Sequence, residues 1–389
     1  MAKLSEIFDL QMGKTPARSK SEYWNNGDNA WVSISDLSAY CKYVGETKET
    51  ISNLAVADSG IKPVPADTVI MSFKLSIGKT AITVDQIYTN EAIMAFVPNG
   101  KYSIYPSYFY HFFGGRDWSV GTNRAVMGST LNKATLGNID IVVPSLDEQK
   151  RISEHLDRVD NLIFLRKLQL SKLDELVKSR FVELFGSIKN NHQRYPVVKI
   201  GSCAKLQGGF AFKSSDYLND GIRLVQISNV NKDTLDWDSI NCVPQAFLQK
   251  YKDFELHVGD LVLAMTRPVI KSLDAVKIST VSENDVPSLL NQRVGRFVVD
   301  RKKLHSVYLM VLCQMPEFRE YVEAMSGNSL QPNISSKQVE DYSIVLPPLA
   351  LQEQFATFVE QTDKSKFEIQ KSLEKLETLK KALMQKYFG

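Results

Sequence analysis

The chain of 389 residues has few of the features that mark catalytic, metal-binding or membrane proteins. Its four cysteines lie far apart and none has the Cys-x-x-Cys spacing, which argues against a zinc site or a disulfide framework. No run of about 18 apolar residues occurs, so no membrane-spanning helix is expected. The opening MAKLSEIFDL lacks the apolar core of a signal peptide. These absences predict a cytoplasmic protein with reduced thiols.

Motifs for nucleotide and methyl-donor binding are also missing. Two Gly-Lys-Thr strings, at 13–15 and 78–80, resemble the end of a phosphate-binding loop. Such a loop needs a glycine five residues before its second glycine, and the sequence has Phe8 and Phe73 there. No Gly-x-Gly-x-x-Gly motif occurs, and the five histidines show no metal-ligand spacing. We therefore expect no catalytic residue, no metal and no cofactor bound by this chain.

Charge of either sign is not in large excess. The formal net charge is +3, so the bulk electrostatics do not indicate nucleic acid as a partner. The apolar content of 43% and the charged content of 23% are typical of a globular protein. Any DNA-binding surface must therefore be built locally, from particular loops.

A long internal repeat is what the sequence does contain. PSLDEQKRI at 144–152 and PPLALQEQF at 347–355 share a proline, a leucine, a glutamine and a large apolar residue at the same spacing. The offset between them is 203 residues, which indicates duplication of a whole domain plus a helix. Looser matches upstream, in the same order, pair 31–37 with 224–230, 66–74 with 259–267, and 92–98 with 293–299, and all read as short strands.

Each copy of the motif begins a long amphipathic helix. Ser145 and Glu148 form a capping box before the first helix, whereas Pro347 and Pro348 lead into the second. Apolar residues then recur with alternating spacings of four and three over roughly 35 residues, or about 50 Å of helix. The predicted coiled-coil seam consists of Ile152, Leu156, Val159, Ile163, Leu170, Leu173, Val177, Leu184, Phe355, Val359, Ile369, Leu373, Leu376 and Leu383.

Two such helices in one chain predict that they pair with each other. Antiparallel packing would relate the two halves by a pseudo-two-fold axis; the alternative is that each helix packs on its own globular domain. The predicted fold class is α+β, with two globular α/β domains joined by the two long helices. The predicted division is 1–144, 145–186, 187–346 and 347–389.

These features resemble the specificity subunit of a type I restriction-modification system. The resemblance covers essentially the whole chain and depends on the order of its motifs, twice over. The motifs are the two Pro-x-Leu-x-x-Gln helix starts, the Phe-Gly helix ends at 185–186 and 388–389, MGKTPARSKSEYW (12–24) with WVSISDL, GGFAFKSSDY (208–217) with LVQISNV, and the polar loops GSTLNK (128–133) and GNSLQPNISSK (327–337).

The resemblance implies a protein that reads DNA without altering it. Residues 1–144 and 187–346 would be target-recognition domains, each reading one half of a split, asymmetric target in double-stranded DNA, with the helix pair as the spacer. Two methyltransferase subunits would bring S-adenosylmethionine and methylate an adenine in each half-site. Translocase-nuclease subunits would bring ATP and Mg for cleavage. No membrane partner is implied.

Polar residues in the loops of each recognition domain are the predicted DNA contacts, because Arg, Asn and Gln pair with base edges while Lys and Ser mostly hold phosphates. In the first half they are Lys14, Thr15, Ser33, Ser35, Lys74, Asn123, Arg124, Ser129, Thr130, Asn132 and Lys133. In the second they are Lys213, Gln226, Ser228, Asn229, Arg267, Lys271, Gln292, Arg293, Asn328, Ser329, Gln331, Asn333 and Lys337.

Two alternative functions are a methyltransferase and a scaffold protein. A methyltransferase fused to its own recognition domains would need an Asn/Asp-Pro-Pro-aromatic motif, but the Pro347-Pro348 pair lies between leucines. A coiled-coil scaffold that binds no nucleic acid would explain the helices but not the paired polar loops.

Overall fold

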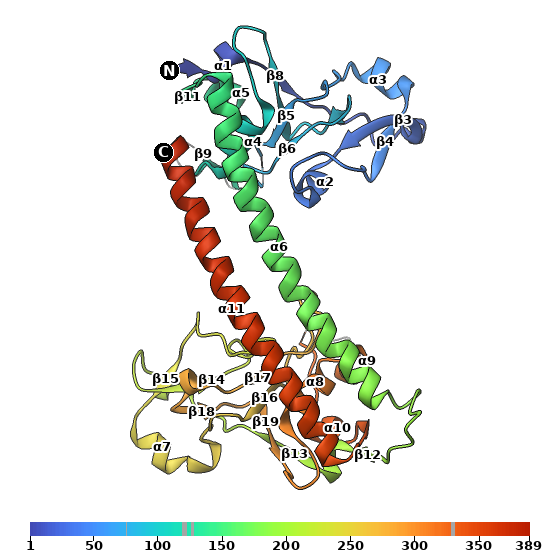
Figure 1. The fold of residues 1–389 in the computed structure, drawn as a ribbon, viewed down its shortest axis with the longest axis vertical. Coiled ribbons are helices and arrows are strands. Elements are labelled where there is room, and N and C mark those ends of the chain that lie inside the picture. Colours follow the sequence, from blue (N-terminus) through green and yellow to red (C-terminus); the bar gives the residue numbers. More distant parts are fainter. Residues whose placement is uncertain (75, 119–122, 126–127, 328–330) are drawn as a thin grey trace. The chain divides into compact units, whose positions relative to one another are not determined.

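The computed structural model describes residues 1–389 except 75, 119–122, 126–127 and 328–330 (Figure 1). The chain divides into two compact units, unit 1 with Met1–Lys167 and Lys371–Gly389, and unit 2 with Leu168–Gln370. Each unit holds one globular domain and part of both long helices, α6 (Leu146–Phe185) and α11 (Leu349–Phe388). Mixed helix and strand content in two domains agrees with the predicted α+β class.

Unit 1 is built from short strands and helices around the start of α6. Its strands are β1 (Ala2–Lys3), β2 (Phe8–Met12), β3 (Trp24–Val32), β4 (Glu49–Ile51), β5 (Val69–Ser72), β6 (Thr80–Ile82), β7 (Tyr88–Thr89), β8 (Ile93–Pro98), β9 (Asn123–Ala125), β10 (Gly128–Thr130) and β11 (Asp140–Ile141). Its short helices are α1 (Leu4–Ile7), α2 (Ile34–Ala39), α3 (Asn53–Ser59), α4 (Pro106–Gly115) and α5 (Lys133–Gly137). Both chain ends lie in this unit (Figure 1).

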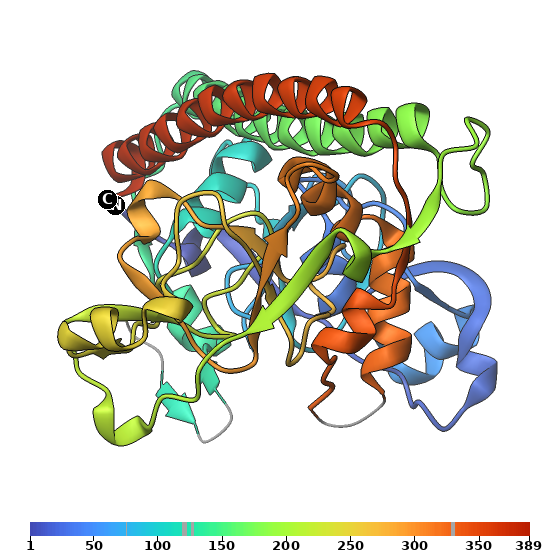
Figure 2. The same cartoon turned by 90° about the horizontal axis from the view of Figure 1, so that it is seen from below.

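The globular domain of unit 2 follows α6 through a polar loop that turns back into β12, as Figure 2 shows. Its strands are β12 (Val197–Lys199), β13 (Ala204–Gly208), β14 (Ile222–Val225), β15 (Cys242–Val243), β16 (Leu261–Ala264), β17 (Ile278–Thr280), β18 (Ser288–Leu290), β19 (Val294–Val299) and β20 (Ser343–Val345). Its short helices are α7 (Ala246–Lys250), α8 (Ser306–Cys313), α9 (Pro316–Ser326) and α10 (Ser336–Glu340).

The strand order is the same in the two units. A four-stranded antiparallel sheet runs β2-β8-β5-β6 in unit 1 and β13-β19-β16-β17 in unit 2. A three-stranded sheet runs β4-β3-β7 and β15-β14-β18, and its last pair is parallel in both. A two-stranded ladder, β1-β11 or β12-β20, closes each domain just before its long helix. The central strands β5 and β16 are buried at every residue, which explains their apolar runs VIM and LVLA.

The glutamine of the repeated motif clamps the start of α6 to the domain that precedes it. Gln149 is fully buried. Its Oε1 accepts a hydrogen bond from the Tyr105 N–H at 2.9 Å, and its Nε2 donates to the carbonyls of Ser103 at 2.9 Å and Pro144 at 3.0 Å. One side chain thus satisfies three backbone groups that would otherwise be unpaired inside the protein.

Gln352 makes the same clamp at the start of α11. It is also fully buried, and its Oε1 accepts from the His305 N–H at 2.8 Å. Its Nε2 donates to the carbonyls of Lys303 at 3.1 Å and Pro347 at 2.8 Å. The repeated motif therefore encodes the same attachment of helix to domain twice.

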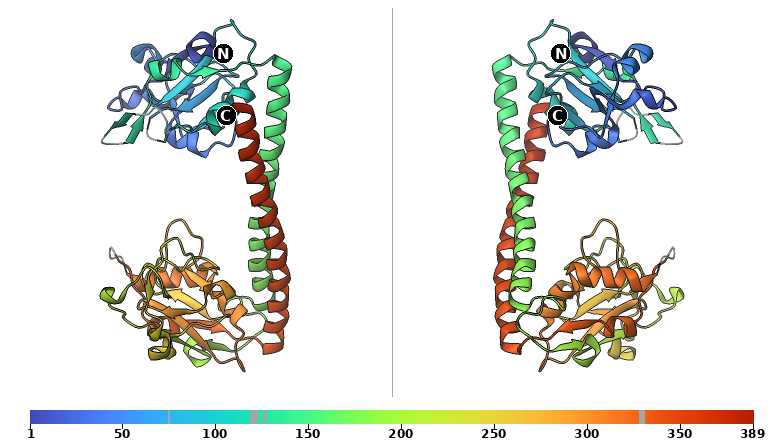
Figure 3. Two further views of the ribbon diagram at one scale, coloured as in Figure 1. Left: turned by 90° about the vertical axis from the view of Figure 1, so that its left-hand side faces the viewer. Right: turned by 90° about the vertical axis from the view of Figure 1, so that its right-hand side faces the viewer.

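The Phe-Gly end of each helix packs in the unit where the other helix starts. In unit 2 the ring of Phe185 lies 4.9 Å from that of Tyr308 and 5.3 Å from that of Phe355 on the first part of α11. In unit 1 the ring of Phe388 lies 5.2 Å from that of Tyr108. Each unit therefore contains the beginning of one long helix beside the end of the other, as the side views of Figure 3 also show.

The predicted seam residues are all buried or half-buried. Near the domains they join the domain core: Leu156 belongs to the core of unit 1, and Val177 and Phe355 belong to that of unit 2. The helices therefore pack on the globular domains as well as close to each other. Their assignment to one continuous seam stays a prediction.

Ion pairs link the two helices within each unit. In unit 1 the Lys380 ammonium lies 2.6 Å from the Asp160 carboxylate. In unit 2 the Lys366 ammonium lies 2.6 Å from that of Asp174. Both lysines occupy positions in the apolar pattern of α11, and each is half-buried with an acidic partner on α6.

Candidate nucleic-acid interface

Three segments of unit 2 meet where β16 ends and β19 begins. The Met265 N–H donates to the Arg293 carbonyl at 2.8 Å, and the Met265 carbonyl accepts from the Ile334 N–H at 2.9 Å. The Arg267 N–H donates to the Pro332 carbonyl at 2.8 Å. These bonds hold together the loops that carry five predicted DNA contacts, namely Arg267, Gln292, Arg293, Gln331 and Asn333.

Arg267 and Arg293 are the basic residues of this junction. Both are exposed, and both have left-handed backbone, with φ of +49° and +69°. Residues other than glycine adopt this conformation infrequently, and it is enriched at functional sites. Within the described part of the chain, no ion pair or hydrogen bond engages either guanidinium. Both groups can therefore make bidentate hydrogen bonds to a ligand such as a guanine edge.

Unit 1 has the same junction where β5 ends and β8 begins. The Phe73 N–H donates to the Ala92 carbonyl at 3.0 Å, and the Leu131 N–H donates to the Phe73 carbonyl at 3.1 Å. Lys74 follows directly, half-buried, with its ammonium 5.2 Å from the centre of the Phe73 ring. The junction brings Lys74 together with the polar loop that ends at Asn132.

A glycine adds a fourth segment to each junction. A Cβ on Gly13, after β2, would lie 2.2 Å from the Thr89 carbonyl oxygen. A Cβ on Gly209, after β13, would lie 2.2 Å from the Asn291 carbonyl oxygen. Only glycine allows this close approach of backbone to backbone. In unit 1 it places Lys14 beside the junction, and the Lys14 N–H donates to the Thr89 carbonyl at 2.8 Å.

Asn90 ties the junction of unit 1 to the three-stranded sheet. Its N–H donates to the Val32 carbonyl at the end of β3 at 3.0 Å, and its Oδ1 accepts from the Ala92 N–H at 2.8 Å. Its Nδ2 donates to the Thr15 hydroxyl at 3.1 Å, and that hydroxyl donates to the Glu91 carboxylate. The loops after β2 and β3 and before β8 are therefore held as one surface.

Asn291 does the same in unit 2 and is buried, with 3% of its surface exposed. Its N–H donates to the Val225 carbonyl at 3.1 Å, its Oδ1 accepts from the Gln292 N–H at 2.7 Å, and its Nδ2 donates to the Tyr217 hydroxyl at 3.3 Å. Neither asparagine was among the residues predicted from the sequence. The signal was present, because each stands two residues before one of the paired strands, 92–98 and 293–299.

Three predicted DNA contacts have hydrogen bonds inside the protein. The Ser33 hydroxyl caps α2, accepting from the Asp36 N–H at 3.2 Å. The Asn132 side chain caps α5, accepting from the Thr135 N–H at 2.8 Å. Asn229 is 1% exposed and its amide bonds only backbone groups of its own loop. Their role in DNA contact stays a prediction.

Other predicted contacts are partly engaged by side chains nearby. Gln226 donates to the Tyr217 hydroxyl at 3.2 Å, and Ser35 accepts from the Lys48 ammonium at 2.9 Å. Lys337 pairs with Asp341 at 3.4 Å. Asn333 bonds the Thr266 hydroxyl, the Lys14 ammonium donates to the Ser59 carbonyl, and Thr15 is engaged as described above.

The remaining predicted contacts are of two kinds. Exposed side chains without a hydrogen bond in the described part of the chain are Lys133, Lys213, Ser228, Lys271, Gln292 and Gln331. Asn123, Arg124, Ser129 and Thr130 lie on the antiparallel β9-β10 pair, where only the backbone is described, and Asn328 and Ser329 lie outside the described residues.

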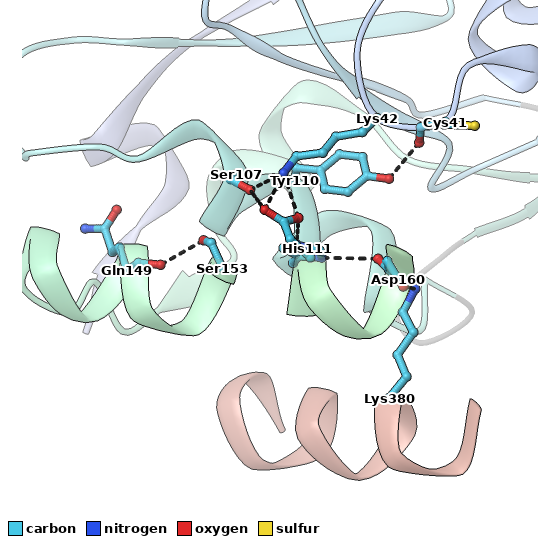
Figure 4. A network of polar contacts seen from close by, with 10 residues as sticks. Cys41, Lys42, Ser107, Tyr110, His111, Gln149, Ser153, Asp160 and Lys380 are labelled. Atoms are coloured by element: carbon cyan, nitrogen blue, oxygen red, sulfur yellow. Dashed lines mark hydrogen bonds and ion pairs between the residues drawn. The ribbon is translucent and has the colours of Figure 1, made fainter. Parts of the chain in front are cut away.

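A polar network ties unit 1's domain to the long helices (Figure 4). The Lys42 ammonium and the His111 Nε2 lie 2.6 Å and 2.8 Å from the Asp157 carboxylate on α6. Burial opposes ionisation of Asp157, but the hydrogen bonds from His111 and Lys42 outweigh it and lower its pKa to about 2. His111 also faces Asp160, with 3.8 Å between Nδ1 and the carboxylate, and Asp160 binds Lys380 of α11.

Unit 2 has a different network in the same place. Gln314 stands where unit 1 has His111, and its amide donates to the Asp233 carboxylate. Lys232 lies 3.1 Å from Asp274 and 3.8 Å from Asp174 of α6. The network has the same position between domain and helices, but glutamine replaces the titratable imidazole.

The described residues contain no group of three or more His, Cys, Asp or Glu side chains arranged to hold a metal ion. In the same part of the chain, no helix combines the length and the apolar character needed to cross a membrane.

The family comparison matches almost the whole chain. Residues 1–175 and 193–381 match the model of the type I restriction modification DNA specificity domain. The MjaIX specificity subunit of Methanocaldococcus jannaschii is 24% identical over 99% of this chain and 91% of its own length. The MjaVIII specificity subunit of the same organism is 29% identical, but the match spans 65% of this chain and only 62% of that relative.

Solved structures show the same fold. A chain from a study of complex assembly and conformational transition of the type I R-M system matches with a TM-score of 0.60 at 16% identity, covering 100% of this chain and 96% of its own. The type I restriction-modification S subunit from M. genitalium matches with a TM-score of 0.56 at 12% identity, covering 100% and 95%. With the family match over both halves, the chain belongs to the type I restriction modification DNA specificity domain family.

Proposed function

We propose that this chain is the DNA specificity subunit of a type I restriction-modification complex and reads a target split into two unlike halves. The single observation that carries the proposal is the junction of loops that occurs once in each unit of a chain from this family. Each junction gathers polar and basic loop residues at the same end of the same four-stranded sheet. A scaffold that binds no nucleic acid, the alternative function, has no support from the relatives.

Different chemistry at the two junctions supports an asymmetric target. Unit 2 offers the free guanidinium groups of Arg267 and Arg293, which suit guanine edges in the major groove. Unit 1 offers the ammonium groups of Lys14 and Lys74, which favour phosphate contacts, and the carboxylate of Glu91, which binds the Thr15 hydroxyl. The two half-sites therefore differ in sequence.

An antiparallel pairing of α6 with α11 would serve as the spacer. The contacts that support it are Asp160 with Lys380 in unit 1 and Asp174 with Lys366 in unit 2. The residue numbers of both pairs add to 540, which is what a single antiparallel register requires. Polar pairs inside an apolar seam fix the register of a coiled coil. The proposed division into recognition domains at 1–144 and 187–346 and helices at 145–186 and 347–389 follows from this arrangement.

Methylation and cleavage belong to partner subunits in this proposal. Two methyltransferase subunits would carry S-adenosylmethionine, and translocase-nuclease subunits would carry ATP and Mg, while this chain binds none of them. The complex would work on DNA in the cytoplasm.

The test is to express the chain with a type I methyltransferase subunit and map methylated adenines by sequencing. We expect a split motif with two different half-sites and a fixed gap. Absence of DNA binding and of methylation in that complex would favour the scaffold.

A second experiment addresses the spacer. Insertion of seven residues in both α6, within 160–180, and the facing part of α11 keeps the seam in phase and adds about 10 Å, or about three base pairs. The tolerated gap should lengthen while both half-sites stay the same. Altered half-sites would mean that the helices themselves read bases.

A further inference from the structure

A pocket in unit 2 has four aromatic residues in its lining. It has a volume of about 430 Å³ and lies between the last turns of α6, the loop after α6, α8, α9 and β20. Rings of Phe181 and Tyr308 form one wall, with centres 5.1 Å apart, and those of Tyr321 and Tyr342 form another, with centres 4.8 Å apart. A volume of this size suits a small organic ligand or a long side chain.

Two carboxylates stand at the rim of this pocket. Glu317 and Glu320 are exposed on the first turns of α9, and no ion pair in the described part of the chain involves either. Burial raises the pKa of Tyr342 to about 12, and the negative charge of Glu317 adds to that effect. Lys189 also borders the pocket, but its exposed side chain pairs with neither carboxylate. Two carboxylates and one ammonium group therefore stand at the rim of the pocket.

The internal repeat supplies a comparison within one molecule. A pocket of about 410 Å³ in unit 1 lies at the end of α11 and includes Phe388 and Phe112, which corresponds to Met315 of the unit 2 pocket. Its lining includes three basic residues, Arg116, Lys380 and Lys381, and one acidic residue, Asp117. A hollow at the helix end is therefore common to both units, but basic residues outnumber acidic ones in the unit 1 pocket, whereas two glutamates and one lysine line the unit 2 pocket.

We propose that the pocket bounded by Phe181, Tyr308, Tyr321 and Tyr342, with Glu317 and Glu320 at its rim, binds an organic cation with an apolar body. Aromatic faces attract an alkylammonium or guanidinium group within about 6 Å of a ring centre, and nearby carboxylates strengthen the attraction. The ligand class covers free amines and the Lys or Arg side chain of a partner polypeptide, which share this chemistry. The proposal does not rest on the DNA-reading function.

The test compares choline with 3,3-dimethylbutan-1-ol, a neutral molecule of the same shape, by isothermal titration calorimetry on the full chain. We expect choline to bind about tenfold or more tightly than the alcohol and its affinity to fall as salt is raised. Blocked lysine and arginine amides form a third arm. Tighter binding of these amides than of choline identifies a polypeptide as the source, and the reverse order identifies a free amine.

Variants locate the site. Glu317→Gln with Glu320→Gln should weaken choline binding several-fold, whereas Glu323→Gln, on the same helix outside the pocket, should not. Tyr342→Leu should weaken it by about 3- to 30-fold, and Tyr342→Phe, which keeps the ring, should retain it. Lys381→Gln at the unit 1 pocket should leave it unchanged.

Equal binding of choline and the alcohol would overturn the proposal, because the pocket would then be merely apolar. Loss of affinity in Glu323→Gln equal to that in the pocket variants, or absence of saturable binding by every cation tested, would overturn it as well. Glu317→Gln and Tyr342→Phe change no packed apolar group, so the proposal stays testable even where Tyr342→Leu fails to fold.

Discussion

Unit 1 and unit 2 are most alike where they hold the long helices and most different where loops meet at the sheet ends. Gln149 and Gln352 clamp three backbone groups each, at distances that agree within a few tenths of an ångström. In contrast, the exposed Arg267 and Arg293 of unit 2 have no arginine counterpart among the described side chains of unit 1's junction. The attachment is therefore constrained by the fold, whereas the side chains at the junctions differ between the units, as the proposed reading of two unlike half-sites requires.

The polar networks between domain and helix fall between these extremes. Both units place lysines and carboxylates there, but His111 in unit 1 corresponds to Gln314 in unit 2. A buried charge needs partners of some kind, and several sets of side chains can supply them. The two networks therefore share their position between domain and helix but not their side chains.

The largest expected effect concerns the clamps. Gln149→Ala or Gln352→Ala leaves three buried backbone groups unpaired, and each change should lower the free energy of unfolding by about 2–4 kcal/mol. Urea denaturation of the full chain measures this, with the exposed Gln354→Ala on α11 as the control. A lower free energy of unfolding for only one of the two variants would show that the two clamps are not equivalent.

The next prediction sharpens the difference between the junctions. Arg293→Ala should relax discrimination at one base pair of a single half-site by about 1–3 kcal/mol, or about 5- to 150-fold, because a bidentate contact to guanine is lost. Methylation mapping of the complex measures it. The half-site read by unit 1 should not change, and relaxation at both half-sites would contradict the assignment of one half to each unit.

A smaller effect separates helix capping from DNA contact. Ser33→Ala removes the cap of α2 and leaves the carboxylate of Asp36, which is 3% exposed, without that partner. We expect a loss of about 1 kcal/mol in stability with the half-site unchanged. Ser35→Ala on the same helix is the control for stability. If Ser33→Ala altered the recognised bases at unchanged stability, the hydroxyl would be a reader instead.

The smallest effect is a dependence on pH in unit 1. The pKa of Asp157 is depressed in the fold, to about 2 from an ordinary value of 3.8. Its stabilisation is therefore present above the ordinary value and lost as the pH falls through about 2. Because the carboxylate is about one-third exposed, the contribution is only about 0.5–1 kcal/mol.

Hydrogen exchange of unit 1 between pH 4 and pH 2 checks this prediction, with Asp157→Asn expected to flatten the change. Asp147→Asn, exposed on the same helix, is the control. An unaltered profile in Asp157→Asn would mean that other carboxylates cause the acid sensitivity.

The sequence predicted the long helices and their apolar residues well, because helical periodicity is a local property. The 203-residue offset also predicted that the start of a long helix occurs twice, and the structure has a glutamine clamp at both starts. What the offset did not reveal is that Gln149 and Gln352 are buried: a glutamine in a charged helical stretch looks like a surface residue until the backbone groups around it are known.

The candidate site was harder to predict, because a polar loop residue looks the same whether it faces solvent or the interior. Asn229 was expected on the DNA surface, yet its amide is fully used within its own loop. Asn90 and Asn291 were overlooked, although they join the loops that carry the other candidates. Arg267 and Arg293 stay predictions, supported by their exposed side chains at the junction.

The clamps described above bind only main-chain N–H and carbonyl groups, which nearly every amino acid supplies. The attachment of helix to domain through these glutamines therefore does not depend on which side chains the domain carries at the bonded residues. Recombination at the helix starts could therefore exchange one recognition domain for another of the same fold. The chain would gain a new target in a single event and keep the same attachment to the helix.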